Sequence, residues 1–182
     1  TRLNGEKETL GFYLTGHPSD SYQLEFADFI QSIGKLNVST GRKVNVCGLV
    51  TSIRQVLTKR GKKLSIIGME DASGSMDIVV FSEVFEPQQA HVVAGQMLMI
   101  EGELGQDDYT GGVKMTATAL FCINDARTRF AKCLAVTLTA ADHSLLEGLQ
   151  SVLKAHQGEC VVQIRYTNST AKAAINLAPL WR

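Results

Sequence analysis

The sequence RKVNVCGLVTSIRQVLTKRGKKLSIIGMEDASGSMDIVVF occupies residues 42–81 and decides the fold. It holds three runs rich in apolar and β-branched residues, which predict three β-strands, at Lys43–Leu57, Lys63–Glu70 and Ser75–Phe81. Asp71-Ala72-Ser73-Gly74, between the second and third run, is typical of a tight turn. Gly48 lies inside the first run, where a strand that curls needs a glycine because backbones come close together. The stretch therefore predicts the start of a small, strongly curled sheet.

The residues that follow complete this pattern. Ser82 is a suitable N-cap for a short helix to about Val93, and Pro87 should shorten or kink that helix. Two more strands are predicted at Gln96–Leu104 and Val113–Ile123. The order strand, strand, strand, helix, strand, strand is that of the five-stranded oligonucleotide-binding (OB) barrel. Residues 42–124 are therefore predicted to form an OB-fold domain that binds nucleic acid.

The barrel is flanked by segments of different character. Before it, helices are predicted at Glu6–Leu14 and Tyr22–Ile33, with Gly16-His17-Pro18 ending the first. We interpret residues 1–41 as a helical adaptor that packs onto something beyond this chain. After it, Asn124–Lys132 predicts a helical bridge.

Residues 125–182 are predicted to form the start of a truncated C-terminal α+β domain. Its strands are expected at Leu134–Leu138, Val161–Thr167 and Ala171–Leu177, and Asn168-Ser169-Thr170 should form a hairpin turn. A helix capped by Thr139 or Asp142 should run to about His156. Its inner face should comprise Leu145, Leu146, Leu149, Val152 and Leu153. The whole chain is thus expected to be mainly β, with an α+β part.

Composition limits the possible partners. Eighteen basic and eighteen acidic residues cancel, so the chain lacks an overall field that would attract DNA or an anionic membrane. No signal peptide or membrane-spanning run is visible, so a cytoplasmic location without membrane contact is expected. The four cysteines are predicted to be small buried hydrophobic residues: Cys47, Cys122, Cys133 and Cys160.

A local cluster of positive charge lies in the first hairpin. The cluster contains Arg54, Lys59, Arg60, Lys62 and Lys63 and no acidic residue. Mobile cations in a flexible loop pair well with phosphate, and this loop flanks the binding face of an OB fold. Lys114 on the fifth strand could add to the cluster, and Tyr109 in the loop before it could stack on a base. We therefore expect weak, salt-sensitive binding of single-stranded nucleic acid, with Phe81 assigned to the core.

Catalytic patterns are missing from the sequence. The four histidines have no metal-ligand spacing, and the adjacent carboxylates Asp107-Asp108 and Glu70-Asp71 lie where convergence on one cleft is rare. Neither a glycine-rich phosphate loop nor a nucleophile elbow is present. We therefore expect no catalytic, metal or cofactor site in this chain.

Several motifs resemble one protein family. EKETLGFYLTGHP (residues 6–18) resembles a stretch that precedes the OB domain in the bacterial replicative DNA polymerase III alpha subunit. Further similar motifs follow in the same order: Val46-Cys47-Gly48-Leu49-Val50, Thr58-Lys59-Arg60-Gly61, Glu70-Asp71-Ala72-Ser73-Gly74, Gly111-Gly112-Val113-Lys114-Met115-Thr116-Ala117 and Asn124-Asp125-Ala126-Arg127. The resemblance covers nearly the whole chain.

The resemblance implies a parent DNA-directed DNA polymerase, a nucleotidyltransferase of DNA replication. It implies that the catalytic carboxylates and their Mg²⁺ lie in a palm domain upstream of this chain. It also implies an OB domain that contacts single-stranded template, with the clamp-loader tau subunit and the sliding clamp as partners. Two alternatives stay open, namely a protein-docking module of the replisome and an anticodon-binding OB domain of a tRNA synthetase.

Overall fold

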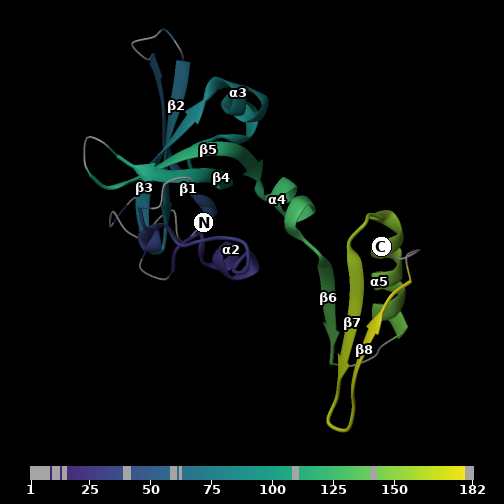
Figure 1. Ribbon diagram of the computed structural model, residues 1–182. Helices are drawn as coiled ribbons and strands as arrows, with labels where there is room; N and C mark the ends of the chain where they lie inside the picture. The colour runs from purple at the N-terminus through teal and green to yellow at the C-terminus, as the bar shows by residue number, and fades with distance from the viewer. Residues whose placement is uncertain are drawn as a thin grey trace. The chain divides into compact units, whose positions relative to one another are not determined.

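The computed structural model describes residues 9, 13, 16–38, 42–57, 61, 63–107, 111–139 and 143–178 (Figure 1). The chain divides into two compact units. Unit 1 is Thr1–Arg127 and unit 2 is Thr128–Arg182.

Unit 1 is built on a closed five-stranded barrel. Its strands are β1 (Arg42–Leu57), β2 (Lys63–Asp71), β3 (Gly74–Phe81), β4 (Met97–Gln106) and β5 (Val113–Cys122). Around the barrel the order is β1-β2-β3-β5-β4, and a parallel pairing of β3 with β5 contributes to the closure. This confirms the predicted fold class, an OB-type barrel followed by a smaller α+β part.

The first strand is long enough to serve both sides of the barrel. Its first half, Arg42–Leu49, pairs with β4, and its second half, Leu49–Leu57, pairs with β2. Gly48 lies at this changeover, where a Cβ would come within 2.5 Å of the Glu70 carbonyl oxygen. The predicted role of Gly48 is therefore confirmed, because any larger residue would force β1 and β2 apart.

Apolar side chains from all five strands fill the barrel. The fully buried members include Val46, Val50, Ile67, Met69, Ile78, Val80, Leu98, Ile100 and Met115. Phe85 and Val92 add to this core from the connection between β3 and β4. Alternation along each strand places these residues inside and their neighbours outside.

The connection between β3 and β4 differs from the predicted helix. It consists of α3 (Ser82–Phe85) and a 3₁₀ helix, η2 (Glu86–His91), with Pro87 near the start of η2. Ser82 is not the N-cap; its hydroxyl donates a hydrogen bond of 2.6 Å to the Lys63 carbonyl. Proline lacks an amide hydrogen and restricts the backbone, which explains why the α-helix ends within one turn.

The predicted helix at Tyr22–Ile33 is wrong. The chain forms a short helix, α2 (Asp20–Glu25), followed by turns and a 3₁₀ helix, η1 (Ile33–Lys35). The chain leaves the helical path because its backbone bonds to the barrel: the Gln31 amide donates to the Asn45 carbonyl at 2.8 Å. The Asn45 side-chain amide in turn donates to the Phe29 carbonyl. The helix predicted at Glu6–Leu14 lies almost entirely outside the described residues.

This N-terminal segment packs on the barrel through Phe26 and Ile33, which are buried. The buried carboxylate of Asp71 joins the two parts. It accepts hydrogen bonds from the amides of Ile33, Ser73 and Gly74 and from the Gln23 side chain. A buried carboxylate needs several donors, so Asp71 is a structural residue.

A second link joins α2 to α4 (Ile123–Phe130), the helix that follows β5. Arg127 donates to both carboxylate oxygens of Glu25, at 2.6 and 2.9 Å. The Arg127 guanidinium lowers the pKa of Glu25 mainly through these hydrogen bonds, and partial burial offsets a part of that effect.

Unit 2 contains the predicted β-α-β-β arrangement. The elements are β6 (Cys133–Leu138), α5 (His143–Ala155), β7 (Val161–Thr167) and β8 (Lys172–Asn176). The strands β6 and β7 are parallel, and β8 is antiparallel to β7. The Asn168 side-chain oxygen accepts from the amides of Thr170 and Ala171, which confirms the predicted hairpin turn.

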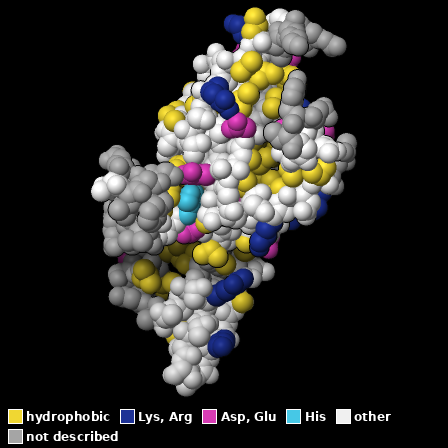
Figure 2. Space-filling view, turned by 90° about the vertical axis from the view of Figure 1, so that its left-hand side faces the viewer, with side chains coloured by type: hydrophobic (Ala, Val, Ile, Leu, Met, Phe, Trp, Pro, Cys, Tyr) yellow, Lys and Arg dark blue, Asp and Glu magenta, His cyan; other side chains and the backbone are white. Residues whose placement is uncertain are grey.

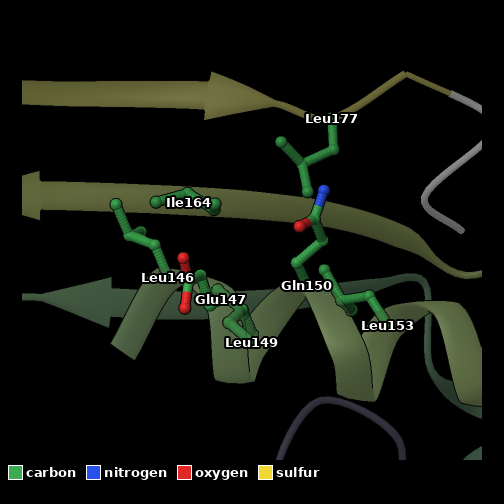
Figure 3. A pocket seen from close by; sticks show the side chains of 7 residues that line it. All are labelled: Leu146, Glu147, Leu149, Gln150, Leu153, Ile164 and Leu177. Carbon is green, nitrogen blue, oxygen red and sulfur yellow. The ribbon is translucent and has the colours of Figure 1, made fainter. Parts of the chain in front are cut away.

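One helix covers the apolar face of this sheet incompletely. A hollow of about 350 Å³ lies between α5 and β7, as Figure 3 shows, and is lined by Leu146, Glu147, Leu149, Gln150, Leu153, Ile164 and Leu177. Of the helix residues predicted to face inward, Leu153 is buried, and Leu146 and Leu149 line the hollow toward Ile164, whereas Leu145 and Val152 are more than half exposed. The prediction of the inner face of α5 is therefore wrong for Leu145 and Val152, which lie at the edge of the apolar stripe.

The cysteines also differ from expectation. Cys47 is buried, Cys122 and Cys160 are half-buried, and Cys133 is exposed at the start of β6. Burial raises the pKa of the Cys47 thiol to about 12. None of the described helices is long and apolar enough to cross a membrane.

Candidate nucleic-acid interface

The outer faces of β1, β2 and β3 form one continuous surface, which we call the strand face. Strand register orders its side chains in three rows. The first row is Val56, Leu64 and Phe81; the second is Arg54, Ile66 and Val79; the third is Ser52, Gly68 and Asp77. Residues paired across neighbouring strands point to the same side of a sheet, so these nine positions share the outside of the barrel.

The first row is apolar and open to solvent. Val56 is 42% exposed and Phe81 is 40% exposed, while Leu64 between them is half-buried. Leu57, at the end of β1, is 66% exposed. An exposed aromatic ring beside aliphatic side chains is a surface on which a nucleic-acid base can stack.

The assignment of Phe81 to the core is therefore wrong. The residues Ile78 and Val80 point into the barrel, so the alternation of β3 turns Phe81 outward. The signal was available in the sequence, because β2 and β3 carry apolar residues at both alternate positions. Such a strand has an apolar outer face as well as a core face.

The middle of the strand face carries an ion pair. The Arg54 guanidinium nitrogen Nη2 lies 2.5 Å from Asp77 Oδ2, and both side chains are more than half exposed. Arg54 belongs to the second row on β1 and Asp77 to the third row on β3, so the pair runs diagonally across β2. Figure 2 shows basic and acidic side chains scattered among hydrophobic ones on the face that it presents.

Gly68 is the β2 residue beneath this diagonal. A Cβ at Gly68 would lie 2.4 Å from the Ser52 hydroxyl and 3.4 Å from an Asp77 carboxylate oxygen. The third row is therefore close-packed because its central residue has no side chain. The sequence alone gave no signal for this pair, because its partners are 23 positions apart.

The structure places three of the predicted site residues. Arg54 is on the strand face and is ion-paired, and Lys63 is exposed at the first position of β2. Lys114 is exposed on β5, directly before Met115, whose register partner is Ile78 on β3. Continuing that register by one residue places Lys114 next to the row of Asp77. The other four predicted residues, Lys59, Arg60, Lys62 and Tyr109, lie outside the described residues.

The basic segment nevertheless joins two described strand ends. β1 ends at Leu57 and β2 begins at Lys63, and these two residues are register partners. These two described ends are next to Val56 and Leu64 of the apolar first row.

The described residues offer little support for a metal-binding or catalytic site. They contain no group of three or more His, Cys, Asp or Glu side chains able to hold a metal ion. His17 lies 3.7 Å from Glu70 through Nε2 and 2.6 Å from the Ser19 hydroxyl through Nδ1. Ser19 is fully buried, and this group of three ties the N-terminal segment to β2.

The chain is similar to known proteins over its OB barrel and over its whole length. The tRNA anti-codon family, described as an OB-fold nucleic acid binding domain, matches residues 44–123. The DNA polymerase III alpha subunit of Pseudomonas aeruginosa is 35% identical over 100% of the chain, and that of Escherichia coli K12 is 33% identical over 99%. The chain spans 16% of the length of each.

The closed five-stranded barrel defines an OB-fold domain, and the family model that matches it is described as an OB-fold nucleic acid binding domain. Over its whole length the chain is related to the DNA polymerase III alpha subunits, as its motifs indicated.

Two solved structures show a low overall similarity. The second OB-fold domain of replication protein A from Methanococcus maripaludis has a TM-score of 0.42 at 16% identity, covering 52% of this chain and 95% of that one. Asparaginyl-tRNA synthetase from Pyrococcus horikoshii has a TM-score of 0.39 at 24% identity, covering 46% of this chain and 19% of that one. At scores this low the likeness adds nothing to what the barrel topology shows.

Proposed function

We propose that unit 1 binds single-stranded template DNA weakly, as a non-catalytic part of a replicative DNA polymerase. The observation that carries this proposal is the strand face, where exposed Phe81 and Val56 lie near the strand ends Leu57 and Lys63, between which the basic segment runs in the sequence. Bases would stack on the apolar first row, and phosphates would pair with Lys59, Arg60, Lys62 and Lys63.

Charge considerations predict the strength of this binding. The chain is neutral overall, so attraction comes from the local cluster alone. If four phosphates of a single strand are neutralised, the logarithm of the affinity falls with the logarithm of the salt concentration with a slope of about −2.8. The affinity therefore falls about 50-fold between about 50 and 200 mM salt. Weak binding of this kind suits a domain that must release the template at each step.

The wider context is part of the same proposal. We place this chain in a DNA-directed DNA polymerase of the bacterial cytoplasm, whose Mg²⁺-dependent chemistry is carried out by a palm domain outside this chain. The clamp-loader tau subunit and the sliding clamp are its proposed partners. Support comes from the similarity to polymerase III alpha subunits over the whole chain.

The test is fluorescence anisotropy of a labelled single-stranded oligonucleotide across a salt series. The variant changes Lys59, Arg60, Lys62 and Lys63 to Glu. The matched control changes four other exposed lysines to Glu, namely Lys35, Lys132, Lys154 and Lys172. We expect the first variant to lose binding and the control to keep most of it. Equal loss in both would reduce the effect to net charge and refute a local site.

A second candidate function is suggested by the aliphatic side chains of the same face. Leu57 and Val56 are 66% and 42% exposed beside Phe81, and such a group of apolar side chains would also suit an apolar segment of a partner protein. Such docking would persist at high salt, whereas DNA binding would not.

A further inference from the structure

The strand face contains a carboxylate where a DNA-binding surface would be expected to carry only cations. Asp77 lies in the third row, and its Oδ2 holds the Arg54 guanidinium at 2.5 Å. We propose that Asp77 acts as an internal competitor of DNA phosphate for Arg54, and so limits the affinity for single-stranded DNA. This inference rests on the proposed function of the strand face.

The position of the pair supports competition. Arg54 lies on β1 between the apolar first row and Asp77, beside Ile66 and Val79. A strand whose bases stack on Phe81 would bring its backbone within reach of a long arginine side chain. The guanidinium has several donors, but a bidentate phosphate contact uses the same donors that a carboxylate uses. Phosphate must therefore displace Asp77 or share Arg54 with it.

The Arg54–Asp77 ion pair contributes little to the stability of the fold. Both side chains are more than half exposed, at 58% and 56%, and exposed ion pairs contribute little to stability. Asp77 differs in this from Asp71, which is buried and bonded to several backbone amides. Removal of the Asp77 charge should therefore leave the fold intact and change the surface alone.

The local packing keeps the two groups together. A Cβ at Gly68 would lie 3.4 Å from Asp77 Oδ1, so the missing side chain lets the Asp77 carboxylate lie close over β2. Lys114 on β5 is exposed, and continuing the β3–β5 register by one residue pairs it with Asp77. The three charges sum to one net positive charge, and they would sum to two if Asp77 were neutral.

The first experiment compares Asp77→Asn with the unchanged chain in single-stranded DNA binding. A freed cation adds one phosphate contact, so the salt slope should steepen by about 0.7 and the affinity at low salt should rise about fivefold. Asp28→Asn is the matched control, because it makes the same chemical change at another exposed aspartate. Asp28 is next to Phe29, whose carbonyl accepts a hydrogen bond from Asn45 near the opposite end of β1. The control should change the affinity less than twofold.

A double-mutant cycle with Arg54→Gln separates competition from general repulsion. If Asp77 acts through Arg54, then Asp77→Asn should raise affinity by less than about twofold in the Arg54→Gln background. An equal rise in both backgrounds would overturn the proposal, because Asp77 would then simply repel phosphate. Weaker binding by Asp77→Asn alone would also overturn it, since Asp77 would then be orienting Arg54 for DNA.

These outcomes are distinguishable from failure of the proposed function. If the unchanged chain binds DNA and loses binding on reversal of the basic segment, the function stands whatever Asp77→Asn does. Binding by Asp77→Asn where the unchanged chain shows none would support strong competition. If neither the unchanged chain nor Asp77→Asn binds at low salt, both the function and the competition are refuted.

Discussion

Replacement of Phe81 by alanine tests the stacking surface directly. The ring is 40% exposed, so a base would contact less than half of it. Base stacking on an aromatic side chain contributes about 1–3 kcal/mol per base, and the partial exposure places Phe81 at about 1 kcal/mol. That free energy corresponds to about a fivefold weaker affinity. The salt slope should not change, because no charge is removed.

The assay is anisotropy of a labelled oligothymidine at low salt, with the fold checked by circular dichroism and thermal unfolding. Phe81→Tyr keeps the ring and should bind like the unchanged chain. Phe130→Ala removes an aromatic ring of unit 2 and should leave DNA binding unchanged. Unaltered binding by folded Phe81→Ala would refute the reasoning, because the strand face would then carry no base.

Three further predictions concern stability and reactivity. Gly48→Ala should destabilise unit 1 by about 3 kcal/mol in chemical denaturation, because its Cβ would approach a β2 carbonyl oxygen to 2.5 Å. The pKa of Glu25 is lowered in the folded chain by Arg127, so its stabilising contribution is present above the unfolded pKa and is lost as pH falls through the folded value. Unfolding followed against pH should show this acid-side loss, and Arg127→Gln should remove it. Thiol labelling should modify exposed Cys133 first and spare buried Cys47, whose pKa is raised to about 12.

Each of these has a contradicting result. A Cβ at Gly105 would meet no atom within 4 Å, so Gly105→Ala should lower the stability of unit 1 only slightly. Equal losses of stability for Gly48→Ala and Gly105→Ala would argue against a close approach of β1 and β2 at Gly48. If Arg127→Gln left the loss of stability at acid pH unchanged, the Glu25–Arg127 pair would not be the cause of that loss. Labelling of Cys47 at the rate of Cys133 would mean that the barrel opens readily.

The strands and their order were predictable because alternation and turn residues are local signals. The Asp71–Gly74 turn and the Asn168–Thr170 turn were both predicted from a few adjacent residues. The prediction of a helix at Tyr22–Ile33 was wrong because the apolar residues of this segment do not lie on one face of a single helix. Phe26 and Ile33 pack against the barrel from turns and a 3₁₀ helix, and backbone bonds to Asn45 hold them there.

The candidate site was only partly predictable for a similar reason. The charges of Lys63 and Lys114 are visible in the sequence, and their exposure follows from the alternation of β2 and β5. The alternation of β3 predicts that Phe81 points outward, but its 40% exposure depends on whether other elements cover that face, which no local pattern shows. The Arg54–Asp77 pair depends on a diagonal across three strands, which no local pattern reveals.

The most direct test of the central claim is to map the DNA-contacting surface residue by residue. Unlabelled oligothymidine would be titrated into the ¹⁵N-labelled chain while amide chemical shifts are recorded. We expect the largest changes at Val56, Leu64 and Phe81 and in the residues between Leu57 and Lys63. Changes concentrated around Leu146 and Ile164 in unit 2, or no changes at low salt, would contradict it.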